Sequence, residues 1–516
     1  MPDKKKKFYV TTSIAYTNSS PHLGFSLEIV QADVIARYHR FLGEDVFFLT
    51  GTDEHGQKVV KAAGKERKEP KKFVDEISAE FKELKKTLNL SNDDFIRTTD
   101  KKRHWPTVER VWQKLKESGD LYKKQYEGLY CVGCEAFITK KDLVDGKCVH
   151  HQKEPETVRE ENYFFRLSEY SLKIKELIEK NEFKIIPESR KNEMLSFVGQ
   201  GLEDVSFSRP RKDLKWGIPV PGDDSQTIYV WADALINYLS VLNYPAGKNF
   251  KKYWPADVHC LGKDILRFHA TIWIGMLLSL GSLLPKKILV HGFITSDGQK
   301  MSKSLGNVVD PFKLVKKYGV DPVRYFLLRE IPPTEDGDFT YEKFEKRYNA
   351  DLANGLGNLV ARVITLAKIS NFPFFAKAAE GKQNTKLQTV INKTRKKYKE
   401  ALDEFKFNEA LISVWELIGF CDKYVEKERP WEKNKGQKKA IGNLLSAVKE
   451  IAKLSGPFLP ETSEKILKQL KTEPPLAEVK AKKKTKKNVS SFVLSLTRRT
   501  KFSSPDKKSK PLFPRI

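Results

Sequence analysis

The chain has 516 residues, which allows about two to four domains, and its 40% hydrophobic and 31% charged residues are typical of a globular protein. No apolar run approaches the roughly 18 residues that a membrane helix requires, and the basic segment 1–7 is too short for a secretory signal, so we expect a cytoplasmic protein without a membrane partner. The net charge of +27 favours a polyanionic partner such as RNA, because neutralised phosphates release counterions, although a generally basic proteome would give the same excess.

The first predicted unit is a strand, a helix and a strand over residues 7–56. Its helix is expected from about Pro21 to Leu42, with Ser20 as N-cap and Pro21 at the first helical position. This places His22 and Gly24 in the first turn, where backbone N–H groups and the helix dipole favour phosphate. Further helices are expected at 78–88 and 102–118.

Residues 119–227 are irregular and rich in Gly, Pro and charge, and we interpret them as an inserted domain. They contain a zinc-knuckle pattern, made by Cys131, Cys134, Cys148 and His151. Four protein ligands predict a structural Zn²⁺ rather than a catalytic one. His150 competes as the fourth ligand, and two accidental cysteine pairs are the alternative. With five cysteines in all, three of them clustered here, a reducing compartment fits better than a disulfide framework.

Strands are predicted again at 229–231, 258–261 and 287–291, and a polar loop follows. In this loop Lys300 and Lys303 lie three residues apart and could follow a moving pyrophosphate as point charges; an ordinary solvated loop is the alternative. The strand–helix alternation predicts an α/β fold, a doubly wound, Rossmann-like parallel sheet whose halves are separated by the insertion. Ligands of such folds bind at the carboxyl ends of the strands.

After residue 310 the pattern is helical, without further strands. The expected division is a first half of the sheet domain, an insertion, a second half, a connecting region, a helical bundle and a basic tail, at 1–118, 119–227, 228–325, 326–350, 351–475 and 476–516. From Lys480 onward the chain has thirteen Lys or Arg against one Asp. We expect this tail to be mobile, and it either holds RNA backbone or only adds solubility.

Several of these segments together resemble the methionyl-tRNA synthetases, a family of class I aminoacyl-tRNA synthetases. The two signatures of the class correspond to residues 21–25 and 300–304. The match extends to 45–56, 229–234, 262–265, 300–307 and 511–516, and it is poorest over 480–510. It implies a catalytic sheet domain split by a zinc-knuckle insertion and followed by an all-α anticodon-binding bundle. We therefore expect an enzyme that ligates L-methionine to its tRNA through a methionyl-adenylate, releasing AMP and pyrophosphate.

The resemblance implies that His22 donates to the phosphates of ATP, that Gly24 admits the adenine end, and that Lys300 and Lys303 stabilise the departing pyrophosphate with Mg²⁺ held mainly by the phosphates. The implied ATP-binding residues are His22, Gly24, Lys300, Met301, Ser302, Lys303 and Ser304. No protein nucleophile is needed, because catalysis would rest on positioning and electrostatics. Where the family has a second histidine this chain has Phe25, which cannot donate a hydrogen bond.

A methionine pocket is also implied by the resemblance. Its residues would be Ile14, Tyr16, Asp53, Trp231, Ala234, Leu235, Tyr238, Ile265 and His269. Asp53 would receive the α-ammonium, and a thioether makes favourable contacts with ring edges. Read alone, Trp231 and Tyr238 are more typical of a core, and His269 on an apolar helix is more typical of a satisfied core histidine.

In the helical region the resemblance implies contacts with the tRNA anticodon. Asn358 and Arg362 are four residues apart and share a helix face, and Trp431 would stack on an unpaired base. The alternative is that Asn358 is an ordinary surface residue and Trp431 a partly buried anchor. We expect a monomer.

Two other functions remain possible on the sequence. A synthetase for another aliphatic amino acid would need a large editing domain, for which the roughly 110 residues between the sheet halves leave no room beside a zinc knuckle. A catalytically weak tRNA-binding paralogue is suggested by Phe25 and would retain tRNA without forming an adenylate.

Overall fold

The computed structural model describes residues 5–133, 136–138, 143–149, 152–301, 306–370, 372, 385–432, 436–471 and 511–516. The chain divides into two compact units. The first unit comprises residues 1–295, 299–316 and 334–337, and the second comprises 296–298, 317–333 and 338–516.

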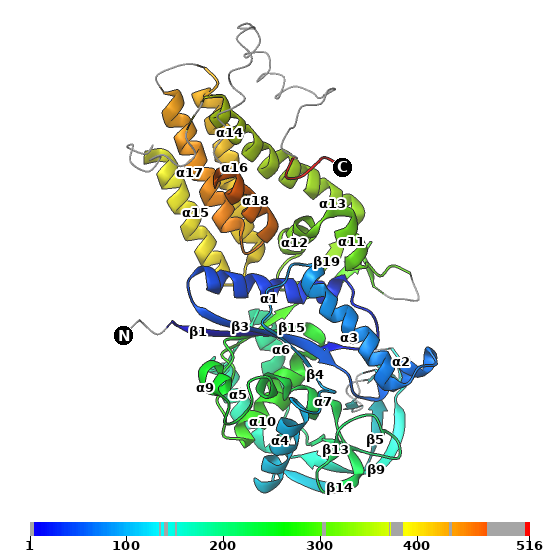
Figure 1. The fold of residues 1–516 in the computed structure, drawn as a ribbon. Coiled ribbons are helices and arrows are strands. Elements are labelled where there is room, and N and C mark those ends of the chain that lie inside the picture. Colours follow the sequence, from blue (N-terminus) through cyan, green and yellow to red (C-terminus); the bar gives the residue numbers. More distant parts are fainter. Residues whose placement is uncertain are drawn as a thin grey trace. The chain divides into compact units, whose positions relative to one another are not determined.

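Within the described residues, the core of the first unit is a sheet of seven strands, all paired in parallel (Figure 1). Six strands follow the order β10-β16-β15-β1-β3-β2, and β4 also pairs with β3. The strands are β1 (Lys7–Thr12), β2 (Ala15–Tyr16), β3 (Asp45–Asp53), β4 (Asp94–Arg97), β10 (Lys184–Ile186), β15 (Val258–Gly262) and β16 (Lys287–His291). Their carboxyl ends share one edge, as the doubly wound prediction requires.

Helices cover both faces of this sheet. Figure 1 shows α1 (Leu23–Phe41) on one side and α4 (Trp105–Glu117), α9 (Lys248–Tyr253) and α10 (Ile274–Ser279) on the other. Helix α1 packs on β1, β3 and β15, and its apolar residues Leu27, Val30 and Val34 are fully buried. The unit also contains α2 (Gln57–Lys65), α3 (Pro70–Thr87), α5 (Ser171–Glu179) and α6 (Glu188–Gly199).

Two local predictions were wrong. Helix α1 begins at Leu23, so the N-cap is His22 rather than Ser20. Residues 229–231, predicted as a strand, begin helix α7 (Val230–Ala234), because β14 (Asp223–Ile228) already ends before them. Aromatic and β-branched residues gave the strand signal, and tertiary contacts of this buried segment override it.

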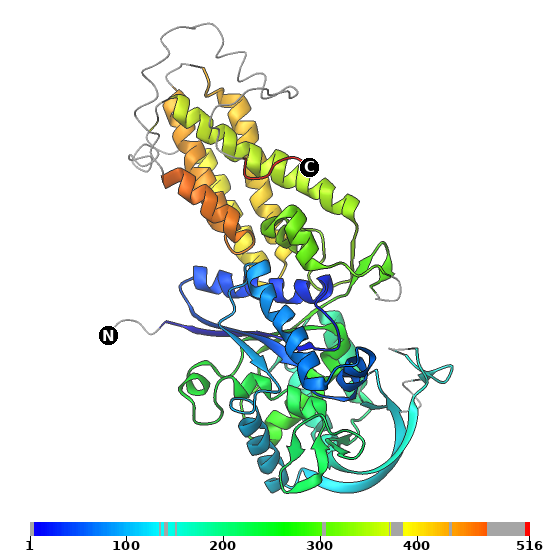
Figure 2. The same ribbon diagram turned by 45° about the vertical axis from the view of Figure 1, so that its right-hand side comes forward.

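The predicted insertion contains a long antiparallel ribbon. Strand β5 (Leu121–Cys131) pairs with β9 (Glu156–Phe165) over ten residue pairs, and Figure 2 shows the pair as a curved band. Its far end carries β6 (Ala136–Ile138), β7 (Leu143–Val144) and β8 (Lys147–Cys148). The chain returns through β10, which joins the parallel sheet beside β16, and through β11 (Val205–Ser206), β12 (Ser208–Pro210) and β13 (Pro219–Val220).

The second unit is helical, as predicted. Its helices are α12 (Val320–Arg329), α13 (Tyr341–Arg347), a π-helix (Tyr348–Gly357), α14 (Asn358–Ile369), α15 (Thr385–Asp403), α16 (Phe407–Glu428), α17 (Gln437–Ser455) and α18 (Pro460–Lys471). A short strand, β19 (Gly337–Phe339), was not predicted. Among the described residues, no helix combines the length and apolarity that a membrane crossing demands.

The last six residues pack on the helical unit. The ring of Phe513, which is 7% exposed, meets Tyr348 at 6.1 Å between centroids. Asn349 exchanges two hydrogen bonds with the backbone of Ile516, at 3.1 and 3.2 Å. These six residues belong to the tail that was predicted to be mobile. The rest of that tail, 476–510, lies outside the described residues, and its mobility stays a prediction.

Candidate active site

The chain that follows the second signature is bonded to the first. The backbone N–H of Leu23, which starts α1, donates to the carbonyl of Val309 at 3.1 Å. Val309 follows the lysine loop, so the chain leaving that loop is bonded to the helix that carries His22. Lys300 ends β18 (Gln299–Lys300), and Met301 follows it. Ser302, Lys303 and Ser304 lie outside the described residues.

His22 caps helix α1 with its own side chain. Its Nδ1 accepts from the backbone N–H of Gly24 at 3.1 Å, so the ring proton of the neutral imidazole sits on Nε2. The residue is exposed, which makes Nε2–H available to an incoming anion. A Cβ at position 24 would lie 2.9 Å from His22 Cε1. The glycine therefore makes room for the histidine ring, a role that the sequence did not reveal.

Phe25 is half-buried and packs against helix α3. Its ring meets Phe81 edge-on, with centroids 5.1 Å apart, an arrangement that aromatic pairs prefer. The position at which the resemblance implies a second histidine is thus occupied here by a packing contact between two helices.

A buried ion pair joins α1 to the end of β16. Glu28 accepts from His291 Nε2 at 2.9 Å and from both the N–H and the hydroxyl of Ser13 at 2.7 and 2.6 Å. Burial lowers the pKa of His291, but the hydrogen bond and charge of Glu28 outweigh it and raise the pKa above its ordinary value. His291 Nδ1 also faces an acceptor, the carbonyl of Gly292 at 2.7 Å. Both ring nitrogens therefore donate, as in an imidazolium.

Several predicted methionine-pocket residues are brought together. Trp231 stacks on Phe268 with centroids 4.0 Å apart, and the Tyr238 hydroxyl lies 2.8 Å from His269 Nε2. One hydrophobic cluster contains Leu235 and Tyr238, with Ile14, Tyr16, Trp231 and Ile265 packed against it, and Ala234 is also buried.

His269 has both ring nitrogens engaged. Burial lowers its pKa to about 4, so the ring is neutral near pH 7. Nδ1 donates to the carbonyl of Ile265 at 3.0 Å, which leaves Nε2 to accept from the Tyr238 hydroxyl. This is the arrangement of a satisfied core histidine, and the sequence had left that alternative open.

Asp53 is the last residue of β3, as the sequence predicted, and is 5% exposed. Its partner in the parallel register is Tyr16. Its carbonyl accepts from the N–H and the hydroxyl of Thr17 at 2.9 and 3.0 Å. The backbone at Asp53 is thereby fixed at the carboxyl edge of the sheet.

The sequence did not reveal a buried network beside these residues. Asp233 accepts from His55 Nδ1 and from His104 Nε2, each at 2.7 Å. His104 Nδ1 lies 2.8 Å from the Ser240 hydroxyl. The sequence did contain one signal for this network, the closeness of its members to predicted site residues. His55 follows Asp53 by two residues, and Asp233 follows Trp231 by two.

Half of the predicted zinc ligands can be located. Cys131 and Cys148 are 2% and 0% exposed and belong to one small hydrophobic cluster with Ile138. Two soft ligands thus belong to the same buried cluster, which fits a zinc site. Cys134, His150 and His151 lie outside the described residues. Within the described part of the chain, no group of three or more His, Cys, Asp or Glu is arranged to hold a metal.

The predicted anticodon residues lie on two segments of the helical unit. Asn358 is exposed on α14, whereas Arg362 pairs with Glu426 on α16 at 2.6 Å and with Asp422 at 3.5 Å. Trp431 is half-buried and follows Arg429, whose φ of 43° ends α16 in a left-handed conformation.

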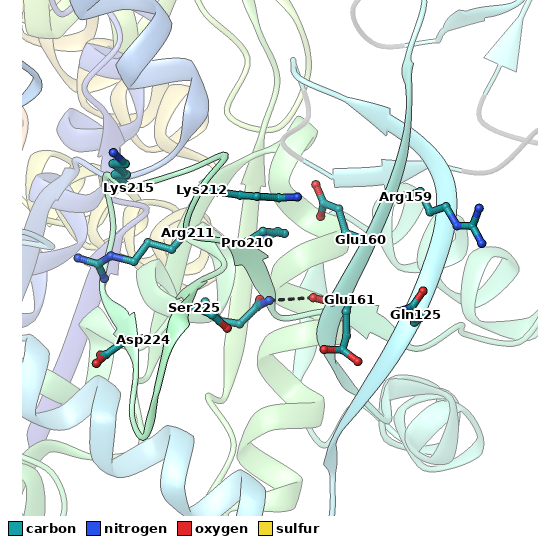
Figure 3. A pocket seen from close by; sticks show the side chains of 11 residues that line it. Gln125, Arg159, Glu160, Glu161, Pro210, Arg211, Lys212, Lys215, Asp224 and Ser225 are labelled. Carbon is teal, nitrogen blue, oxygen red and sulfur yellow. Dashed lines mark hydrogen bonds between the residues drawn. The ribbon is translucent and has the colours of Figure 1, made fainter.

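A groove of about 670 Å³ lies elsewhere in the first unit. Figure 3 shows its residues, which come from the β5–β9 ribbon and from residues 210–226: Gln125, Arg159, Glu160, Glu161, Pro210, Arg211, Lys212, Lys215, Asp224, Ser225 and Gln226. A hydrogen bond of 2.8 Å from Gln226 to the carbonyl of Glu161 joins its two sides. Its charges are of both signs, and it contains none of the predicted site residues.

The chain matches two known families along most of its length. Residues 8–149 and 138–364 match the family described as tRNA synthetases class I (M). Residues 385–507 match the anticodon-binding domain of tRNA ligase. The first match covers the sheet unit and the helical unit as far as residue 364, and the second covers helices α15 to α18.

Named relatives are similar over most of the chain. The methionine–tRNA ligase of Caldanaerobacter subterraneus subsp. tengcongensis is 46% identical, covering 90% of this chain and 74% of its own. That of Thermotoga maritima is 44% identical, with coverages of 90% and 76%. The solved structure of Mycobacterium tuberculosis methionyl-tRNA synthetase in complex with methionyl-adenylate is 37% identical, with a TM-score of 0.85 and coverages of 99% and 100%.

Proposed function

The chain belongs to the methionine–tRNA ligase family of class I synthetases, and we propose that it joins L-methionine to its tRNA through a methionyl-adenylate. First, the methionine carboxylate attacks the α-phosphate of ATP in line and pyrophosphate leaves. Then the terminal ribose of the tRNA takes the methionyl group and AMP leaves. The observation that carries this proposal is the similarity, over 99% of the chain, to a relative solved with methionyl-adenylate.

For ATP, we assign the donor role to His22 Nε2–H. Two features support the assignment: Gly24 holds the other ring nitrogen, and the helix N-terminus adds a favourable dipole. Lys300 and Lys303 would neutralise the departing pyrophosphate, and Met301, Ser302 and Ser304 would complete the loop. Mg²⁺ would be held mainly by the phosphates, as ATP sites usually hold it. All these groups act by position and charge.

For methionine, we assign Asp53 to the α-ammonium and the ring-rich cluster to the side chain. The assignment is supported by the parallel register of Tyr16 and Asp53 and by the stack of Trp231 on Phe268. A thioether gains from contacts with ring edges. Tyr238 and His269 would form one wall of the pocket. Because their polar atoms bond to each other, this wall would present mainly apolar surface to the ligand.

For the metal, we propose a structural Zn²⁺ on Cys131, Cys134, Cys148 and His151. The ion would hold the tip of the inserted ribbon as a cross-link between its strands. The proposal is supported by the joint burial of Cys131 and Cys148. Removal of zinc by a chelator should unfold the ribbon tip and reduce tRNA charging, and a ribbon that stays folded and active without metal contradicts it.

For tRNA, we propose anticodon contacts by Asn358, Arg362 and Trp431. Arg362 would have to exchange its ion pair with Glu426 for a base edge, whereas Asn358 is exposed without that constraint. The monomeric state and the cytoplasmic location stay predictions.

Amino-acid-dependent pyrophosphate exchange tests the function directly. Purified protein with ATP should exchange pyrophosphate with methionine and only weakly with leucine, isoleucine or valine, and it should charge tRNA. Exchange that prefers another aliphatic amino acid would point to a different synthetase. Retention of tRNA without any pyrophosphate exchange would favour a tRNA-binding paralogue, the alternative that Phe25 suggested.

A further inference from the structure

The Asp233 carboxylate joins the segments that carry the proposed methionine site. His55 directly extends the end of β3 that carries Asp53, and its backbone carbonyl accepts from the Tyr16 hydroxyl at 2.9 Å. His104 reaches Ser240, the last residue of α8 (Asn237–Ser240), the helix that holds Tyr238.

Asp233 itself belongs to the short helix α7, between Trp231 and Ala234. By one hydrogen bond of 2.7 Å to His55, its carboxylate therefore connects the segment of Trp231 to that of Asp53. A second bond of 2.7 Å connects it to His104.

The network is buried, and the direction of its hydrogen bonds is fixed by the charge of Asp233. The side chains of Asp233, His55 and His104 are 1%, 4% and 0% exposed. Burial raises the pKa of Asp233, but the charges and hydrogen bonds of the two histidines outweigh it and lower the pKa below its ordinary value. An ionised carboxylate only accepts hydrogen bonds, so both imidazoles must donate to it. Such charge-assisted bonds are among the stronger ones in proteins.

Helix α7 has little stability of its own, so its position depends on tertiary contacts, of which this network is one. It has five residues, and α8 has four, far fewer than an isolated helix needs in water. The side chain of Trp231 is half-buried and makes its stack with Phe268 from this helix. A shift of α7 would therefore move Trp231 relative to Asp53, whose backbone is held separately by Thr17.

We propose that Asp233 is a positioning residue of the methionine site. It sets the spacing between Asp53, which would bind the ammonium, and Trp231, which would line the side-chain pocket, without itself touching methionine. The proposal rests on the proposed function. ATP binding should be spared, because the ATP groups at the start of α1 and in the lysine loop are outside this network.

The test compares Michaelis constants in methionine-dependent pyrophosphate exchange. Asp233→Asn keeps the shape of the side chain but removes its charge and one acceptor. We expect the KM for methionine to rise by about tenfold to a hundredfold, the usual effect of losing a hydrogen bond to a charged group. The KM for ATP should stay within about twofold, as for independent sites.

A matched pair at His55 separates positioning from general destabilisation. Asparagine presents its amide nitrogen where histidine presents Nδ1, so His55→Asn keeps a donor toward Asp233 and His55→Ala does not. The alanine variant should reproduce the rise in the KM for methionine, and the asparagine variant should restore most of it. This pair also tests the proposal if Asp233→Asn does not fold.

Glu44→Gln is the control elsewhere in the same unit. Glu44 binds His39 Nδ1 at 2.7 Å, so the same chemical change breaks the same kind of bond. It lies beyond the far end of α1, whose 19 residues span about 28 Å. This variant should leave both Michaelis constants unchanged.

The outcomes separate failure of the proposed function from failure of the positioning role of Asp233. If the wild-type protein shows no methionine-dependent exchange, the proposed function fails, and the inference with it. If wild type is active and folded Asp233→Asn or His55→Ala has an unchanged KM for methionine, the inference alone is wrong. Equal rises in both Michaelis constants would also overturn it, because they would indicate a general loss of structure.

Discussion

In the sheet unit, buried polar side chains gather at the carboxyl ends of the strands, whereas in the helical unit they join one helix to another. Asp53 and His291, at 5% and 7% exposure, end strands β3 and β16. In the helical unit, Asn443 on α17 donates to the Tyr424 hydroxyl on α16 at 2.9 Å, and the buried Glu450 on α17 accepts from the exposed Arg395 on α15 at 2.6 Å.

The difference shows that burial of polar groups alone does not mark a site. In the helical unit these groups bond to side chains or to backbone of neighbouring segments and hold a scaffold. In the sheet unit they converge on one edge from segments far apart in sequence, as Glu28 and His291 do. Equivalent substitutions in the two units should therefore affect different properties: catalysis in the sheet unit and stability in the helical unit.

The largest expected effect follows from removing the proposed phosphate donor while keeping the helix cap. Asparagine is as good an N-cap as any residue, so His22→Asn should preserve α1 but lose Nε2–H. Pyrophosphate exchange should fall by about a hundredfold to a thousandfold, the usual cost of losing one transition-state donor. The free energy of unfolding, measured by urea denaturation, should change little.

The helical unit supplies the matched control for that variant. Thr340 caps α13 by accepting from the N–H of Lys343 at 3.1 Å, and Thr340→Asn replaces one good cap by another. Exchange should be unaffected. If His22→Asn also catalysed pyrophosphate exchange at the wild-type rate, the side chain of His22 would act only as a helix cap and not as a phosphate donor.

Next in size is the loss of a buried scaffold cation. Arg324 is fully buried and donates to the carbonyls of Phe458 and Pro457 at 2.9 and 3.0 Å. Arg324→Met fills similar space but leaves two carbonyls without these donors, at a cost of about 1–3 kcal/mol each. Denaturant unfolding of the helical unit should shift accordingly, while exchange per folded molecule stays constant; a coupled loss of exchange would refute the contrast between the units.

A smaller effect is expected from the proposed anticodon stack. Trp431→Ala should lower kcat/KM for tRNA charging, with a loss of transition-state stabilisation of about 1–3 kcal/mol, the usual contribution of one aromatic–base stack. Pyrophosphate exchange should stay intact. Tyr341→Ala is the control, because Tyr341 is an aromatic side chain of the same unit that is 52% exposed. Equal losses in both assays, or equal losses in both variants, would exclude the stacking role.

The sequence predicted the architecture well because hydrophobic periodicity is a local signal. Strand β16 has the predicted bounds, and apart from strand β19 the second unit is helical as expected. The strand predicted at 229–231 was wrong because its conformation depends on contacts that the local pattern does not contain. Asp233 is drawn into a helix that packs against histidines 129 and 178 positions away in sequence.

The candidate site was predictable as a set of residues but not as a set of contacts. The segments containing His55 and Asp233 belonged to the family resemblance, yet only the fold shows that these two side chains meet. Likewise, Gly24 suggested an opening for a ligand, whereas its neighbour is the ring of His22. Contacts between segments distant in sequence need the tertiary structure.

A pH-dependent contribution to stability is expected from the Glu28–His291 pair. Because the pKa of His291 is raised in the folded protein, its contribution is fully present below the ordinary histidine value of about 6.5 and is lost as the pH rises through the folded value. His291→Gln should therefore destabilise the protein more at pH 6 than at pH 9, as measured by urea unfolding at the two values. An equal loss of stability at both would mean that charge on His291 does not contribute.

The smallest effect is expected at Phe25, where the chain departs from its family. The ring packs edge-on against Phe81, so Phe25→His should lower the free energy of unfolding by about 0.5–1.5 kcal/mol, the worth of an aromatic pair. Exchange should rise by less than about tenfold, because packing rather than a missing donor explains the residue. A hundredfold rise would instead show that the native site lacks a donor it needs, and it would place the chain nearer to a weakened paralogue than to an efficient ligase.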